Sequence, residues 1–501
     1  MRSFSSRSRC LRSLFPRCPF SRQPFPLAGL AAAVAIAATL NGCVGQAPAD
    51  AAKPFEPARL GLAQNTAAWP AADWWSAFDD AQLSRLIELA RADHPSIQIA
   101  EARVREAQQY ALATRAVNQP DIALNGQVTR QHYSENYIYP APLGGSIATE
   151  GRVALDFSYE FDFWGRQRAQ LDAALREVDV EAAERSAAQL VLATAVAQNY
   201  FSLQGHYADR ALVEQLVAQR KAARHLLQLR VERGLSSRAE LEAPTAALAD
   251  AEQELAAAEQ RIDIDRHQLA ALCGRGPDTL DTIAPVALNP AAQSAPAALP
   301  ADLLARRADI AAQRLRAEVA AKDIAAAKAE FYPNIDLSAF FGVQSIGTSD
   351  LFKGSSRTWG VGPALHLPIF NRESLRAQLG ARYADYDIAV GQYNQSVLDA
   401  VRETADAGTA TRALTRQRAA ADTAQAALER ARAAAQTRYR QGLSNQLELL
   451  NADIAALNQR RTLVAIQASQ LQAQLALIKA LGGGYSSLSE PTNESTQARG
   501  D

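Results

Sequence analysis

VALDFSYEFDFWGR, residues 153–166, is the segment that best indicates how this chain folds. Up to position 163 its apolar and polar side chains alternate, with Leu155 and Phe157 on one face and Asp156 and Glu160 on the other. An alternation of period two predicts a β-strand with one apolar and one polar face. The run is about as long as the 9–11 residues that cross a bilayer as a tilted strand. It indicates either a strand in the wall of a membrane barrel, with lipid outside and water inside, or a strand of a soluble sandwich whose apolar face is buried.

Three further segments alternate in the same way. We therefore predict four strands, at 121–131, 151–163, 334–345 and 357–369. The segment 132–150 is rich in Tyr, Gly and Pro, and 346–356 is rich in Gly and Ser, so both are expected to form exposed hairpin loops.

Two properties of these strands favour a membrane barrel built from several chains. Aromatic residues lie near the strand ends, as in the aromatic belts at membrane surfaces: Trp164, Phe331, Tyr332, Trp359 and Phe370. Four strands cannot close a membrane barrel, which needs about eight, and open strand edges are not tolerated in lipid. The chain should therefore oligomerise, and three copies would supply twelve strands.

Long helices are expected on both sides of the strands. Proline and glycine, which interrupt helices, are absent from 166–204 and 206–233. A continuous helix over 166–233 would be on the order of 100 Å long. In the helix that follows, apolar residues recur every seven positions, at Leu241, Leu248, Leu255, Ile262 and Leu269. This spacing predicts coiled-coil packing with a left-handed twist. An ordinary helical bundle would explain this spacing equally well, but it would not explain the strands.

The sequence contains two copies of one unit. Gly-Leu-Ser at 234–236 recurs at 442–444, and Pro-Asp-Ile at 120–122 recurs as Pro-Asn-Ile, in each case roughly 210 residues later. Each unit reads helix, strand, loop, strand, very long helix, tight turn, long helix. The first repeat covers 83–272 and has a tip turn at 234–238. A linker over 273–299 leads to the second repeat, which covers 300–481 and has a tip turn at 442–446. Residues 482–501 form a C-terminal tail.

The N-terminus has the pattern of a secretory signal. An arginine-rich head is followed by an apolar run over 27–40 and then by Leu40-Asn41-Gly42-Cys43. The alternative is a single transmembrane anchor, but the apolar run is shorter than the roughly 20 residues that a spanning helix needs. The ending resembles the lipobox of bacterial lipoproteins. This resemblance implies a signal peptide over 1–42, a lipid on Cys43, an anchor and linker over 43–82, and a place at the outer membrane.

Composition and motifs give no sign of chemistry. The net charge of −1 indicates no binding to nucleic acid. The six histidines have no metal-binding spacing, and neither a Gly-x-Ser-x-Gly elbow nor a Gly-Lys-Ser/Thr phosphate loop occurs. Once the signal is removed and Cys43 carries lipid, only Cys273 remains, so no internal disulfide can form. We therefore expect no enzyme, no catalytic residue, no metal and no cofactor.

The motifs together resemble those of the TolC-like outer membrane factors, over nearly the whole mature chain. They comprise the duplicated unit, Phe161-Asp162-Phe163-Trp164-Gly165-Arg166, Gly362-Pro363 with Leu367-Pro368-Ile369-Phe370, and Arg438-Tyr439-Arg440-Gln441-Gly442-Leu443. The lipobox and Trp74-Trp75-Ser76-Ala77-Phe78 are similar to the NodT-type lipoprotein branch. Arg307-Ala308-Asp309-Ile310 departs from the Arg-Pro-Asp-Ile common in that family.

This resemblance implies the fold, the partners and the role. The fold is mainly α with membrane β: a homotrimer with a twelve-stranded β-barrel in outer-membrane lipid and a long coiled-coil tunnel in the periplasm. The segments 43–82, 273–299 and 482–501 would form the tether and a belt around the tunnel. The partners are a periplasmic membrane-fusion adaptor and an inner-membrane resistance-nodulation-division pump. The role is a passive, gated exit duct for small molecules such as drugs. A protein-secretion (type I) duct and a pore-free periplasmic coiled-coil adaptor lipoprotein remain as alternatives.

The resemblance also implies a gate at the periplasmic tip. The acidic aperture positions fall on Glu448 and Asn451, and Tyr439 and Glu240 match residues that hold neighbouring coils closed. The adaptor would contact the two tip turns, which contain Gly234, Leu235, Ser236, Gly442, Leu443 and Ser444. The alternative is that Glu240 and Glu448 are ordinary solvated helix residues.

Overall fold

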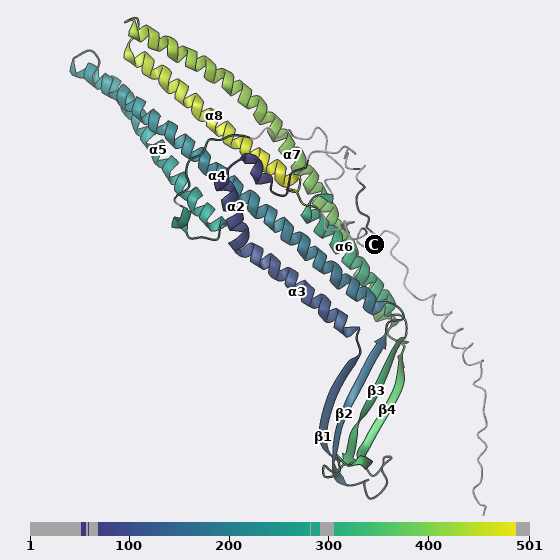
Figure 1. Ribbon diagram of the computed structural model, residues 1–501. Helices are drawn as coiled ribbons and strands as arrows, with labels where there is room; N and C mark the ends of the chain where they lie inside the picture. The colour runs from purple at the N-terminus through teal and green to yellow at the C-terminus, as the bar shows by residue number, and fades with distance from the viewer. Residues whose placement is uncertain (1–51, 57–58, 60–68, 281, 291–304, 487–501) are drawn as a thin grey trace, which may run out of the picture. The chain divides into compact units, whose positions relative to one another are not determined.

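The computed structural model describes residues 52–56, 59, 69–280, 282–290 and 305–486 (Figure 1). Cys43 and the expected signal peptide lie outside the described residues, as does most of the expected tail after 481. All described residues belong to one unit, Ala47–Asp501.

The chain forms the predicted succession of helix, two strands, very long helix and long helix twice, and the first copy has one additional helix, α2, before it. The first copy contains α2 (Ala81–Asp93), α3 (Pro95–Val117), β1 (Asp121–His132), β2 (Ile147–Phe161), α4 (Arg166–Glu232) and α5 (Arg238–Leu272). The second contains α6 (Ala308–Ala329), β3 (Asn334–Ile346), β4 (Arg357–His366), α7 (Arg372–Arg440) and α8 (Gln446–Ala480). Short 3-10 helices lie at Trp74–Phe78 (η3), Pro277–Leu280 (η4) and Gly354–Ser356 (η6). α2 and α3 are separate because Pro95 has no N–H to continue a helix and begins the second one instead.

The four strands form one antiparallel sheet in the order β1-β2-β3-β4 (Figure 1). The register aligns the apolar rows: Leu155 on β2 lies between Leu124 on β1 and Phe341 on β3, and Phe341 pairs in turn with Trp359 on β4. This apolar face is open, since Leu124 is 70% exposed and Trp359 is 72% exposed. Within the described residues no second sheet covers it, which counts against a soluble sandwich.

The opposite face of the sheet is polar. Asp156 accepts a hydrogen bond from Asn125 Nδ2 at 2.7 Å and pairs with Arg152 at 2.6 Å. Gln344 Nε2 donates to Glu150 across the strands. One face for lipid and one for water is the distribution that a barrel wall requires.

β1 and β3 each extend one residue past their predicted ends, to His132 and Ile346, and the other two strands differ more. β2 begins at Ile147 rather than 151, which shortens the expected loop, and it ends at Phe161 because Asp162 turns to accept hydrogen bonds from the first N–H groups of α4. Such an N-terminal cap is worth about 1 kcal/mol. β4 ends at His366 rather than 369, since Pro368 cannot donate to a ladder. Leu367 and Ile369, which the predicted strand 357–369 included, therefore lie outside β4.

The helices pack in two four-membered layers that share α4 and α7. Next to the sheet the order of neighbours is α3-α4-α6-α7, and further away it is α5-α4-α8-α7 (Figure 1). Each layer is therefore open at two edges, just as the sheet is open at β1 and β4. None of the helices in the described part combines the length and hydropathy that a membrane-spanning helix needs.

The largest apolar core lies where the two layers meet. It contains Trp74, Tyr200, Leu269, Leu475 and further buried side chains of α2, α4, α5 and α8. Tyr200 donates its hydroxyl hydrogen to Asp80 at 2.6 Å, and Asp80 also caps α2. Part of the segment that follows α5 crosses α4 here, held by Gln204, which accepts from the N–H of Val286 and donates to the carbonyl of Ala284.

Candidate functional site

The two tip turns have the same backbone geometry at the same end of the helices (Figure 1). Gly234 and Gly442 take left-handed φ values of 75° and 71°. In each turn the next residue donates its N–H five positions back: Leu235 to Arg230 at 2.7 Å, and Leu443 to Arg438 at 2.9 Å. This is the Schellman motif, which satisfies the free carbonyls at a helix end and favours glycine for its φ.

Each turn presents a leucine to solvent. Leu235 is 66% exposed and Leu443 is 67% exposed. The prediction that these turns contact an adaptor is not tested by the chain alone, but two exposed leucines at equivalent places give a partner apolar surface to cover.

Both gate glutamates lie in the first turn of the helix that follows a tip turn, and the Glu240 side chain also caps its helix. Glu240 Oε1 accepts from the backbone N–H of Ser237 at 3.1 Å and from its hydroxyl at 3.0 Å, as in a capping box. The hydrogen bonds that Ser237 donates from its backbone N–H and from its hydroxyl lower the pKa of Glu240. Glu448 accepts from the Ser444 hydroxyl at 2.5 Å, while its own N–H donates to the Asn445 side chain at 3.0 Å. The carboxylates therefore have local structural partners.

Within one copy the remaining gate residues stay apart. Asn451 is exposed one turn after Glu448 on α8. Tyr439 is 39% exposed near the end of α7, and in the described part of the chain no contact joins it to Glu240. A tie between Tyr439 and Glu240 thus requires a neighbouring copy and stays a prediction.

Ion pairs between the long helices were not anticipated from the sequence. Apolar residues recur every three or four positions along α8, as at Ile454, Leu457 and Val464, and Arg461 interrupts them. Arg461 pairs with Asp209 on α4 at 2.8 Å and with Glu254 on α5 at 2.5 Å. Nearer the tip, Arg432 on α7 pairs with Asp453 on α8 at 2.7 Å. A charged residue at a position expected to be apolar was the available sign for Arg461.

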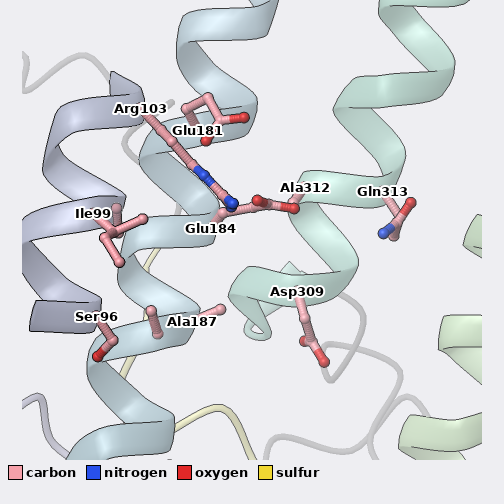
Figure 2. Close-up of a pocket in the computed structure, with 11 residues that line it drawn as sticks. Ser96, Ile99, Arg103, Glu181, Glu184, Ala187, Asp309, Ala312 and Gln313 are labelled. Carbon is pink, nitrogen blue, oxygen red and sulfur yellow. The ribbon is translucent and has the colours of Figure 1, made fainter. Parts of the chain in front are cut away.

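A small cavity of about 360 Å³ lies between α3, α4 and α6. Figure 2 shows Arg103 extending from α3 toward Glu181 and Glu184 on α4. Glu184 is paired with Arg316 of α6. Burial raises the pKa of Glu181, and repulsion from the charge of Glu184 raises it further. The pKa of Glu177 is raised by burial first and then by repulsion from the charge of Glu181. The cavity is thus lined by charged side chains from all three helices. Among the described residues no group of His, Cys, Asp and Glu could hold a metal ion.

Comparison with known proteins assigns the chain. Residues 86–275 and 299–483 both match the family described as outer membrane efflux protein. The multidrug resistance outer membrane protein MdtP of Escherichia coli strain K12 is 33% identical over 445 residues, which cover 86% of this chain and 91% of that protein. The fusaric acid resistance protein FusA of Burkholderia cepacia is 38% identical over 332 residues, which cover 65% of this chain and 62% of that protein.

A solved structure agrees with these relatives. The outer membrane protein VceC of Vibrio cholerae matches with a TM-score of 0.76 at 36% identity, covering 83% of this chain and 100% of that chain. The likeness confirms the expected TolC-like architecture of an α-helical tunnel joined to a β domain, and the expected outer-membrane location. The chain belongs to the outer membrane efflux protein family.

Proposed function

We propose that three copies of this chain form the exit duct of a tripartite efflux pump. The observation that carries the proposal is that the sheet and both helix layers are four-membered and open at two edges. Each open edge can be closed by a neighbouring copy, β1 against β4 and α3 or α5 against α7. Apolar side chains exposed on the edge helices support this closure: Tyr110 (65%), Leu112 (54%) and Val117 (71%) on α3, and Ile388 (59%) on α7.

The sheet has the features of one third of a membrane barrel. Its apolar face is exposed, and an open β1 or β4 edge in lipid would leave backbone groups without hydrogen bonds. Exposed aromatic side chains mark both ends of the apolar band, with Trp359 toward the loops and Trp164 and Phe370 toward the helices. Such belts mark the two surfaces of a membrane.

The cargo and partners follow from the relatives. MdtP and FusA are described by resistance to drugs and to fusaric acid, which favours small molecules over secreted proteins. The duct itself would be passive, with an inner-membrane resistance-nodulation-division pump supplying energy and a periplasmic adaptor joining the two. The adaptor would contact the tip turns at Leu235 and Leu443.

Membrane fractionation with channel recording tests the proposal. The full chain should appear in outer-membrane fractions, migrate as a heat-sensitive trimer, and give discrete conductance steps in planar bilayers. A monomer released with periplasmic contents would contradict it and would favour a pore-free adaptor lipoprotein.

We predict that Cys43 carries the lipid anchor. Labelled fatty acid should be incorporated into the wild type and lost in Cys43→Ser. The variant should keep part of its efflux function, since the barrel holds the trimer in lipid independently. Label that persists in Cys43→Ser would place the modification elsewhere.

A second prediction concerns the gate. Three symmetry-related copies of Glu448 at a narrow mouth would concentrate cations there. Glu448→Gln should weaken cation preference and block by multivalent cations in single-channel recordings. Glutamine can still accept the Ser444 hydrogen bond, so this variant removes the charge and keeps the cap.

The closing tie is tested separately. Tyr439→Phe combined with Glu240→Gln should raise conductance, because exposed polar ties are worth only about 0–1 kcal/mol each and a few of them can balance a gate. Glu242→Gln, an exposed carboxylate on the same helix as Glu240, is the matched control and should leave currents unchanged. If Glu448→Gln and the double variant both behave like wild type, these glutamates serve only their local hydrogen bonds to Ser444 and Ser237.

A further inference from the structure

The outward, apolar face of the sheet ends in arginines at its loop end. On β1, Arg130 follows Val128 on this face and is exposed. On β4, Arg357 pairs with Val343 and lies two residues before Trp359 on the same face, where it is also exposed. Both arginines therefore lie just beyond the apolar band, near the loop ends of β1 and β4. These strand ends point away from the helices (Figure 1).

These two guanidinium groups differ from the arginine on the inner face. Arg152, on the polar face of β2, is paired with Asp156 at 2.6 Å and lies over the Phe340 ring. Within the described part of the chain, the side chains of Arg130 and Arg357 have no ion-pair or hydrogen-bond partner. A guanidinium group is suited to bind a phosphate group through paired hydrogen bonds.

Two other charged groups near this rim already have partners of their own. Lys353 is paired with Asp350 in the loop before β4. Glu150 lies on the inner face, where Gln344 and the Tyr133 hydroxyl donate to it. His132, the last residue of β1, lies on the same outward face as Arg130.

The two arginines are on opposite edges of one sheet and come together only in the trimer. β1 and β4 are the edge strands, and both present their loop ends to the same side. In the proposed trimer β1 of one copy adjoins β4 of the next, which places Arg130 of one subunit and Arg357 of its neighbour at one seam. Trp359 beside them marks the membrane surface, where lipid phosphates lie.

We propose that each of the three seams binds the phosphate groups of lipid A, the phosphorylated lipid of the outer leaflet. This inference rests on the proposed trimer. The guanidinium groups would grip phosphate oxygens through paired hydrogen bonds, while the acyl chains cover the apolar band below, around Val128 and Val361. The lipid would thereby bridge neighbouring subunits as well as surround them.

Native mass spectrometry of the purified full-length trimer in detergent tests this site. The probes are lipid A carrying two phosphates, the same lipid after removal of its phosphates, and inorganic phosphate. The wild type should bind the phosphorylated lipid about tenfold more tightly than the dephosphorylated one, given the attraction expected of two basic residues near a membrane surface. Inorganic phosphate should compete weakly, because it lacks the apolar contacts.

Substitutions locate the site. Arg130→Gln and Arg357→Gln should each reduce the preference, and together they should abolish it. Arg152→Gln removes the same charge from the inner face and should leave the preference intact. A wild-type trimer with no preference for the phosphorylated lipid, or a double variant that keeps the preference, overturns the proposal. A wild type that is monomeric before lipid is added contradicts the proposed function instead.

Discussion

Phe157→Arg is expected to remove most of the trimeric outer-membrane form, whereas Ser158→Arg should leave it largely intact. Phe157 lies in the middle of the apolar row of β2, between Ile122 and Ala339 on the neighbouring strands. An arginine on the lipid face near the bilayer midplane costs about 2–4 kcal/mol, and a trimer would carry this cost three times. Ser158 faces the polar side between Asp121 and Ser338, where water fills the proposed lumen.

The two variants form a matched pair, since they introduce the same side chain at adjacent positions of one strand. The measurement is the yield of heat-sensitive trimer in outer-membrane fractions at equal total expression. Leu155→Arg should repeat the loss, because Leu155 shares the outward face and is 49% exposed. Equal losses for Phe157→Arg and Ser158→Arg would mean that the two faces of the sheet do not meet different solvents.

The faces of the strands could be predicted because the alternation of apolar and polar residues is a local pattern. Alternation along a strand assigns each side chain to a face with no knowledge of its neighbours, and the observed register then joined Leu124, Leu155, Phe341 and Trp359 into one apolar surface. The helix α4 could be predicted as readily, since residues 166–233 contain no proline and Gly205 as the single glycine. The end of β2 could not be predicted in this way. Asp162 turns out of the strand and accepts hydrogen bonds from the N–H groups of Gln167 and Arg168 at the start of α4.

The candidate gate was predicted only in part. The sequence Ser237-Arg238-Ala239-Glu240 has the spacing of a capping box, so the local role of Glu240 was available from its residues. The role of Arg461 depends on Asp209 and Glu254, which lie more than two hundred residues away in the chain. No local pattern predicts such a partner. Contacts between copies, on which the gate and the seams depend, are likewise absent from any one chain.

Arg307→Met is expected to loosen the joint between the second repeat's three helices. The Arg307 side chain, 8% exposed, pairs with Asp309 at the start of α6 at 2.7 Å and with Glu403 on α7 at 2.9 Å. It also donates to the carbonyl of Ala480 at the end of α8 at 3.3 Å. α6 begins here without the proline common in the family, so the arginine network fixes its first turn.

The expected loss is about 2–3 kcal/mol, below the range for a fully buried pair, because Asp309 and Glu403 are 48% and 39% exposed and can regain water. Hydrogen exchange should quicken in the first turn of α6 and the last turn of α8, and the helical signal should melt at a lower temperature. Arg314→Met, on the same helix and 54% exposed, is the control and should change little. Unchanged exchange in Arg307→Met would show that apolar packing alone fixes this joint.

The same network gives a pH dependence with a definite sign. Burial would raise the pKa of Asp309, but the hydrogen bond and charge of Arg307 outweigh it and hold that pKa below its usual range. A carboxyl whose pKa is lowered by folding stabilises the folded state above its unfolded pKa of about 4 and loses that contribution as pH falls through the folded value. The difference in melting temperature between wild type and Arg307→Met should therefore be constant from about pH 8 to pH 5 and narrow in more acidic solution. A difference that instead widens as pH falls would show that Asp309 does not depend on Arg307 for its charge.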